Sequence, residues 1–299
     1  MMILVSGLLN TETTTAVRGF PISYYPIDYP FFGINTAVSG VAFNISKALR
    51  TLGDEVRLTS MTGTDFAASY IRDALHQLGI DSSCVSPKLR QTPSSVVLYD
   101  PDGKRQIYCD LKDIQENSYD FAPSILDGVD LVVACNTNFN RPLLRLAKQM
   151  GKTIATDVHV LSNICDEYNR EFMEYADILF LSDEGIGEPY QDFLRQLAHT
   201  YGSRIIVLGR GGKGAAIYLR ESDRILDMPA FSVGKVVNTV GAGDALFSAF
   251  LHDYARGCDP VTALRRSQIF AAHKITVSGA SNGFVSEQTI DDWASTHMG

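Results

Sequence analysis

The sequence predicts an α/β fold, a three-layer α/β/α sandwich whose mostly parallel central sheet is covered by helices on both faces, with a second, small β-sheet beside it. Two observations support this prediction. Short apolar runs alternate with stretches of helical periodicity along most of the chain, which is typical of parallel sheets. Two segments in the first 110 residues break that alternation and have the pattern of hairpin strands instead.

The elements of the main sheet follow one another in order. Strands are expected at residues 2–6, 56–59, 131–134, 153–156, 178–181 and 205–208. Helices are expected at 40–52 and 65–78, each closed by a glycine, and at 142–150 and 191–199. Because ligands of such folds bind beyond the carboxyl ends of the strands, the residues that follow the strands are candidate site residues.

The small sheet is expected from about residues 11–38 and 94–110, within a single domain that spans residues 1–299. Residues 94–100 and 105–109 form a hairpin around the turn Pro101-Asp102-Gly103-Lys104. Residues 11–19 and 35–38 flank an aromatic and proline-rich stretch at 20–32. This stretch is interpreted as packing between the small sheet and the body or at a dimer interface; the alternative is stacking on a sugar or a nucleobase.

A glycine-containing loop before an apolar helix is the most informative segment of the chain. Gly241-Ala242-Gly243 leads into this helix, and Asp244 stands in its first turn. The first N–H groups of a helix lack internal partners and bind anions. A carboxylate beside an anion is reasonable if a hydroxyl lies between them, because the carboxylate then takes the proton while the hydroxyl attacks a phosphoryl group. The alternative is a capping aspartate, with a stabilising contribution of about 0.5–2 kcal/mol.

Three segments carry a resemblance to a known family. The run Asn238-Thr239-Val240-Gly241-Ala242-Gly243-Asp244 resembles the D-T-x-G-A-G-D signature of the ribokinase-like (PfkB) sugar and nucleoside kinases. Residues 7–12, G-L-L-N-T-E, resemble the G-x-x-N-x-D pattern of that family. Residues 39–49 and the Leu-Gly pair at 52–53 resemble its G-G-x-x-x-N-x-A helix start and closing L-G. The resemblance implies a ribokinase-like sandwich in which the small sheet is a lid over the substrate.

The resemblance also implies an activity. The chain is expected to transfer the γ-phosphoryl group of ATP to a hydroxymethyl group of a sugar, with Asp244 as the base and the N–H groups of Gly241, Ala242 and Gly243 as the anion hole. The helix N-terminus is expected to lower the pKa of Asp244. A nucleoside acceptor is one alternative, and a non-catalytic ligand-binding member of the family is another.

The substrate residues follow from the same resemblance. Asn10, Glu12, Gly40 and Asn44 match positions that grip substrate hydroxyls, because amides and a carboxylate offer the donors and acceptors that a polyol needs. The alternatives are that Asn44 caps or packs its helix and that Glu12 lies exposed at a turn. Glu12 replaces an aspartate of the family pattern, so the pocket can bind a different set of substrate hydroxyl groups from that of other family members.

A second glycine run satisfies G-x-G-x-x-G at residues 209–214, but strand patterns at 215–219 and 225–228 follow it. The run therefore predicts a hairpin turn and not the helix start of a dinucleotide-binding fold. The resemblance places Gly211 and Gly214 beneath the nucleotide, together with Ser182.

Two metal ions are considered for the site. Asp183 and Glu184 are candidates to hold Mg²⁺ through water; as an alternative, they are solvated loop acids. Asn238 stands where several family members have an aspartate that helps to hold a monovalent cation, so the change to an uncharged side chain puts activation by K⁺ in doubt.

Composition excludes several other functions. The net charge of −8 argues against nucleic acid as a partner. Five widely spaced cysteines without a C-x-x-C pair indicate reduced thiols, and no apolar run approaches the roughly 20 residues that span a bilayer. A cytoplasmic protein without a membrane partner is therefore expected. We also expect a homodimer that forms through the lid, since a small sheet with apolar strands leaves exposed edges and faces that need a cover.

Overall fold

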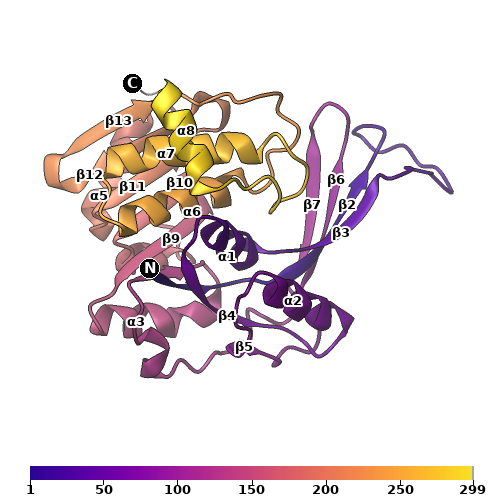
Figure 1. The fold of residues 1–299 in the computed structure, drawn as a ribbon, viewed down its shortest axis with the longest axis horizontal. Coiled ribbons are helices and arrows are strands. Elements are labelled where there is room, and N and C mark those ends of the chain that lie inside the picture. The colour runs from indigo at the N-terminus through magenta and orange to yellow at the C-terminus, as the bar shows by residue number, and fades with distance from the viewer. Residues whose placement is uncertain (298–299) are drawn as a thin grey trace.

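The computed structural model describes residues 1–297 and confirms the predicted fold class (Figure 1). The last two residues of the predicted domain lie outside this described part. The main sheet has nine strands in the order β13-β12-β11-β10-β9-β8-β1-β4-β5. Its strands are β1 (Met2–Ser6), β4 (Glu55–Met61), β5 (Val85–Ser86), β8 (Leu131–Ala134), β9 (Thr153–Val160), β10 (Ile178–Ser182), β11 (Ile205–Gly209), β12 (Ala215–Leu219) and β13 (Arg224–Met228).

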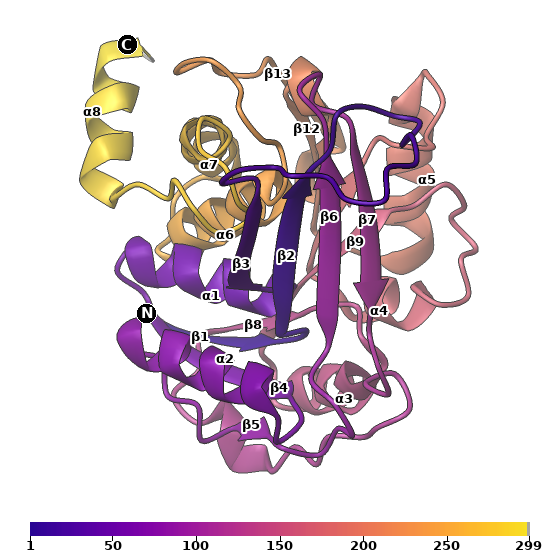
Figure 2. The same cartoon turned by 90° about the vertical axis from the view of Figure 1, so that its right-hand side faces the viewer.

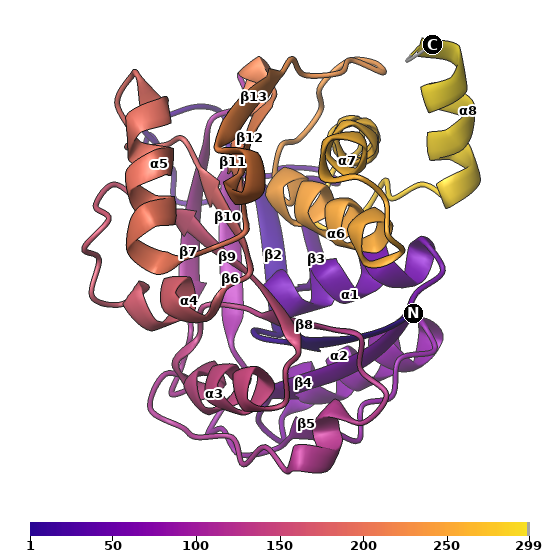
Figure 3. The same cartoon turned by 90° about the vertical axis from the view of Figure 1, so that its left-hand side faces the viewer.

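Helices cover both faces of this sheet, as Figure 3 shows. One face carries α1 (Val41–Thr51), α2 (Phe66–Gln77), α6 (Ala242–Ala255) and α7 (Pro260–Lys274), with α8 (Glu287–His297) packed outside them. The other face carries α3 (Arg141–Gln149), α4 (Arg170–Tyr175) and α5 (Tyr190–Tyr201). Strand alternation divides the core: Ile3 and Val5 of β1 face the first set of helices, and Leu4 faces the second.

The pairs from β5 to β11 are parallel, whereas β12 and β13 pair antiparallel at one edge. The glycine run at 209–214 forms a short turn between β11 and β12, with a 3₁₀ segment at Gly211–Lys213. The prediction of a hairpin instead of a dinucleotide-binding helix start is therefore confirmed. None of the helices in residues 1–297 combines the length and the hydrophobicity that crossing a bilayer requires.

The small sheet contains four strands in the order β3-β2-β6-β7 and stands beside the main body (Figure 2). Its strands are β2 (Asn10–Ala16), β3 (Ile34–Ser39), β6 (Ser94–Tyr99) and β7 (Arg105–Asp110). Only three residues separate β1 from β2, so the chain passes directly from the main sheet into the small one. Since Glu12 pairs with Ala37 and Ser95, and Ser95 pairs with Cys109, these four side chains share one face of the small sheet.

The aromatic stretch lies in the loop between β2 and β3, and most of its large side chains are exposed. Tyr24 is 88% exposed, Phe31 85% and Phe32 100%. Arg18 packs over the Tyr25 ring and pairs with Asp28, so the loop is held mainly by its own residues. The interpretation that these aromatic residues pack between the small sheet and the body of the same chain is therefore wrong; the dimer interface and the ligand contact stay predictions.

Candidate active site

The start of α6 is fixed by a close backbone contact. Gly241 has a φ of +79° and precedes the helix, and a β-carbon there would lie 2.1 Å from the carbonyl oxygen of Ala280. Only glycine avoids this collision and adopts the left-handed conformation at low cost. The loop after α7 therefore sets the position of the loop that enters α6.

Free N–H groups are present at this helix start. Ala242 donates its N–H to the carbonyl oxygen of Thr239 at 3.2 Å. Within the described chain, the N–H groups of Gly241, Gly243 and Asp244 have no acceptor. Nothing lies within 4 Å of a β-carbon placed on Gly243, so the approach is open. Of the predicted anion hole, Gly241 and Gly243 thus present free donors, while Ala242 is already engaged.

Asp244 is half-buried in the first turn of α6, and its pKa differs from the expectation. Burial raises the pKa of its carboxyl, and nearby Asp157 adds to this, although Asn44, His159 and Lys274 act in the opposite direction. The predicted low pKa is wrong, because the loss of hydration on burial is the largest effect on this carboxyl. A raised pKa makes the carboxylate a better proton acceptor.

Asn44 and Asp244 meet although 200 positions separate them. The side-chain amide of Asn44, in the first turn of α1, donates to Oδ2 of Asp244 at 2.7 Å. This contact requires α1 to start at Gly40, where φ is +102° and a β-carbon would lie 2.4 Å from the carbonyl oxygen of Leu8. Asn44 therefore orients the carboxylate, and Gly40 fixes the start of its helix.

Two buried amide oxygens near this point have no partner among the described residues. Asn10 is 3% exposed and donates to Oγ of Ser95, but its Oδ1 is free; Asn44 is 4% exposed, and its Oδ1 is also free. Buried acceptors are seldom left unpaired, so both atoms are suited to receive hydroxyl groups of a ligand.

Glu12 lies half-buried in β2 and belongs to the same charged group. Ser39 donates to its Oε2 at 3.3 Å. Burial raises the pKa of Glu12, and the charge of Asp244 raises it further. Since each carboxylate that ionises disfavours ionisation of its neighbour, the pair needs positive charge nearby.

Three charged residues of the site were missed by the sequence analysis. Lys274 ends α7, is 0% exposed, and donates to the carbonyl oxygen of Asn238 at 3.4 Å. Burial lowers its pKa to about 8, against the raising effects of Asp244 and Glu12. Arg105 of β7 donates to Oγ1 of Thr239 at 2.9 Å.

The third missed residue is His159, at the carboxyl end of β9. It has a φ of +59°, which is uncommon for a residue other than glycine, and a positive charge on its ring would lower the pKa of Asp244. A positive φ depends on tertiary context, so no local sequence pattern marks this histidine.

The predicted nucleotide residues follow β10 and β11. Gly214 must be glycine because a β-carbon would lie 2.0 Å from the carbonyl oxygen of Met228, whereas Gly211 faces open space. Oγ of Ser182 accepts the N–H of Glu184 at 3.3 Å. The carboxylates of Asp183 and Glu184 accept no hydrogen bond from residues 1–297, so both are available to hydrated Mg²⁺.

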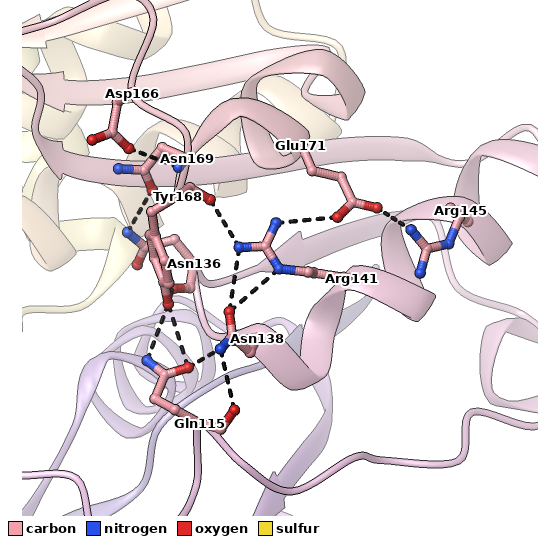
Figure 4. Close-up of polar contacts among 9 residues, drawn as sticks. All are labelled: Gln115, Asn136, Asn138, Arg141, Arg145, Asp166, Tyr168, Asn169 and Glu171. Carbon is pink, nitrogen blue, oxygen red and sulfur yellow. Dashed lines mark hydrogen bonds and ion pairs between the residues drawn. The ribbon is translucent and has the colours of Figure 1, made fainter.

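A polar network fixes the loops that follow β8 and β9 (Figure 4). Asn138 donates to the carbonyl oxygen of Gln115, Asn136 donates to Oδ1 of Asn169, and the Tyr168 hydroxyl donates to the carbonyl oxygen of Asn136. Because these amides are engaged with one another, they rigidify this side of the fold and are poor candidates for binding a substrate.

Comparisons with known proteins cover nearly the whole chain. The sequence model described as pfkB family carbohydrate kinase matches residues 5–287. The chain is 25% identical over 270 residues to the fructosamine kinase FrlD of Bacillus subtilis, which covers 89% of this chain and 91% of the relative. A microbiome-derived acarbose kinase superposes with a TM-score of 0.87 at 23% identity, over 97% of each chain. Arabidopsis thaliana ribokinase, solved with ribose and ATP, superposes with a TM-score of 0.80 at 19% identity, also over 97% of each chain.

Proposed function

The chain belongs to the pfkB family of carbohydrate kinases, and from this premise we propose that it transfers the γ-phosphoryl group of ATP to a hydroxymethyl group of a sugar, with Asp244 as the base. Membership supports the coarser statement, an ATP-dependent sugar kinase that phosphorylates an alcohol group. The choice of base, anion hole and acceptor rests on the arrangement of side chains at the start of α6.

The observation that carries the proposal is the position of Asp244. Its carboxylate is held by Asn44 at 2.7 Å and lies in the same helical turn as the free N–H groups of Gly241 and Gly243. An acceptor hydroxyl beside the carboxylate would give its proton to Asp244 as its oxygen bonds to the γ-phosphorus of ATP, while the bond between that phosphorus and the β-phosphate oxygen breaks and ADP leaves. The N–H groups would stabilise the charge on the phosphoryl oxygens.

ATP and Mg²⁺ fit the residues around this turn. The open approach to Gly243 admits a phosphate group; Gly211 follows β11, and Ser182 is the last residue of the neighbouring strand β10. Asp183 and Glu184 would hold Mg²⁺ through water, and the ion would neutralise charge on the phosphate oxygens. Phosphoryl transfer depends mainly on such positioning and charge stabilisation.

The polar groups on the other side of Asp244 support a sugar as the acceptor. The free Oδ1 atoms of Asn10 and Asn44 and the carboxylate of Glu12 offer several acceptors to a polyol. The exposed aromatic residues lie in the loop between β2 and β3, and none of the described contacts joins their rings to this group of residues. A nucleobase therefore has no evident stacking platform at Asp244.

The proposal is tested by ADP formation with a panel of acceptors. Purified protein with ATP and Mg²⁺ is assayed against free hexoses and pentoses, amino-substituted sugars, oligosaccharides and nucleosides, with a no-acceptor reaction to measure ATP hydrolysis. We expect ADP formation that requires a sugar and yields a phosphate ester of it. Turnover with nucleosides alone would replace the sugar by a nucleoside. Binding of ATP without turnover on any acceptor would favour a non-catalytic ligand-binding member.

A further inference from the structure

Lys274 is a buried cation to which the proposed reaction assigns no role. It is the last residue of α7, its side chain is 0% exposed, and Nζ donates to the main-chain carbonyl oxygen of Asn238 at 3.4 Å. Asn238 begins the segment that contains Gly241, Gly243 and Asp244. The side chain therefore links the end of α7 to the loop that binds the anion.

Charged groups from three other elements face this lysine. Asp244 of α6 and Glu12 of β2 favour its positive charge, and Arg105 of β7 opposes it. In residues 1–297, Nζ forms no ion pair with a carboxylate, so the ammonium acts through space on both acids and directly on a carbonyl group. Lysines are seldom fully buried without a paired acid, which makes this position unusual.

The oxygens of Asn238 do not fit a separate monovalent cation. Its side-chain Oδ1 accepts the N–H of Val240 at 2.7 Å, and its main-chain oxygen accepts Nζ of Lys274. A cation bound to the main-chain oxygen would lie within about 6 Å of the ammonium group, which is 3.4 Å from the same oxygen, and the two like charges would repel each other. The position that the family resemblance reserves for a bound cation is thus served by a side chain of this protein.

Backbone contacts show how this charge acts on the anion site. The N–H groups of Val237 and Asn238 both donate to the carbonyl oxygen of Ile275, the residue after Lys274. Ala280, five residues further on, lies against Gly241. The segment after Lys274 therefore contacts the loop before α6 at two points, and a shift of the Asn238 carbonyl group would move the N–H groups at the start of α6.

We propose that Lys274 is an internal cation that positions the anion-binding loop and supplies the positive charge beside Asp244 and Glu12, so that the site needs no bound K⁺. Lys274 is a positioning residue in this proposal, because it acts through the loop and not on the reacting atoms. The expected effect of Lys274 on turnover rests on the proposed kinase function. The expectation that the site binds no K⁺ does not rest on it.

The first test measures thermal unfolding of the ligand-free protein in KCl, NH₄Cl and choline chloride at equal ionic strength. We expect the same unfolding temperature for the wild type in all three salts. The Lys274→Ala variant opens a space beside two acids and a carbonyl group, and we expect KCl or NH₄Cl to raise its unfolding temperature above that in choline chloride. A saturable KCl-specific rise in the wild type would overturn the proposal, and so would no salt-specific rise in the variant.

The second test measures turnover in the same salts. The Lys274→Met variant keeps the volume of the side chain and removes the charge. We expect kcat to fall by roughly 10²-fold through loss of loop positioning, with a change of KM for the acceptor below about threefold. Ammonium is expected to restore part of the activity of Lys274→Ala. Full turnover by Lys274→Met in choline chloride would overturn the positioning role.

A control variant separates this role from general effects of replacing a lysine that donates to a main-chain carbonyl oxygen. Lys152 also donates to a main-chain carbonyl oxygen, that of Val129 at 2.8 Å, but it lies before β9 at the opposite end of the strand from the site. Lys152→Met is expected to keep wild-type turnover and the same response to the three salts. The unfolding test needs no acceptor, so it remains decisive even if the kinase proposal fails.

Discussion

Asp244 illustrates how the immediate surroundings of one side chain determine its chemistry. Burial raises the pKa of its carboxyl, and the Asn44 amide opposes this rise by donating to the ionised oxygen. The ionised carboxylate can therefore take a proton, and the Asn44 amide fixes its orientation. Loss of the Asp244 charge and loss of the Asn44 amide that orients it should therefore affect turnover differently.

Asp244→Asn should remove the proton acceptor and leave the shape of the site nearly unchanged. We expect kcat to fall by roughly 10²–10⁴-fold, with ATP binding retained. Because the folded state holds the proton of Asp244 more tightly than the unfolded chain, ionisation of this group destabilises the fold at neutral pH. The variant should therefore unfold at a higher temperature than the wild type without ligand. Turnover close to that of the wild type would exclude Asp244 as the base.

The pH dependence of kcat/KM should follow the ionisation of Asp244. The protonated carboxyl cannot accept a proton, so activity should be lost as the pH falls through a midpoint above the ordinary value of 3.8. Burial also raises the pKa of Glu12, and the Glu12→Gln variant distinguishes the two acids. If the acidic limb disappears in that variant, Glu12 and not Asp244 controls the profile. Unfolding measured over the same range shows where the protein remains folded.

The sequence allowed prediction of those residues whose chemistry is marked by a local motif. Asp244 and Gly241 belong to such a motif, and the structure places them together at the start of α6. Lys274 and Arg105 carry no local signal, because their neighbours in space come from distant elements. The pKa of Asp244 was also predicted wrongly, since desolvation depends on tertiary packing that the motif does not encode.

At the scale of elements, the start of α6 contains one glycine that the fold requires, Gly241, and one that it does not, Gly243. Gly241→Ala would place a methyl group 2.1 Å from the Ala280 oxygen at a φ of +79°, and we expect a loss of about 1–3 kcal/mol in the free energy of unfolding. Gly243→Ala meets nothing within 4 Å and should change stability by less than about 0.5 kcal/mol, but raise the KM for ATP because the methyl group narrows the approach. Chemical denaturation and steady-state kinetics of the two variants test this prediction. Equal free energies of unfolding for Gly241→Ala and Gly243→Ala would contradict it.

Arg105 connects the small sheet to the same loop. Its hydrogen bond to Thr239 spans 134 positions and joins β7 to the segment before α6. Arg105→Gln should lower kcat/KM about tenfold, which corresponds to one charged hydrogen bond of roughly 1.5 kcal/mol, and should leave unfolding unchanged because the side chain is exposed. Arg18→Gln, in the loop between β2 and β3, is the matched control. Equal kinetics of the two variants would show that Arg105 has no part in the site.

Helices and strands were predictable where buried apolar residues recur at regular spacing in the sequence. The strands of the main sheet are apolar almost throughout, and α2 begins after Asp65, whose side chain accepts the N–H of Ala68. The two-residue strand β5 has no such pattern, since it is set by its pairing with β4. The expectation of apolar strands in the small sheet was wrong for β2, whose residues 11–15 are four threonines and Glu12.

At the scale of the whole molecule, the exposed aromatic loop needs a cover. Phe31 and Phe32 are at least 85% exposed, and Phe31 stacks on the exposed ring of Tyr29; soluble monomers seldom present large apolar side chains together in this way. We expect a homodimer at micromolar concentration that buries this loop, and a Phe31→Ser, Phe32→Ser double variant that is monomeric and folded. Sedimentation velocity tests both, with circular dichroism as the control for folding. A wild type that sediments only as a monomer would contradict the prediction.

The 200 positions between Asn44 and Asp244 have a consequence for the biosynthesis of the enzyme. The first helix can form while the ribosome has made only one sixth of the chain, yet the carboxylate that it orients emerges after more than four fifths of translation. A prematurely terminated product therefore contains Asn44 without the carboxylate that it orients in the complete fold. If Asp244 is the base, as proposed, such a fragment should transfer no phosphoryl group from ATP.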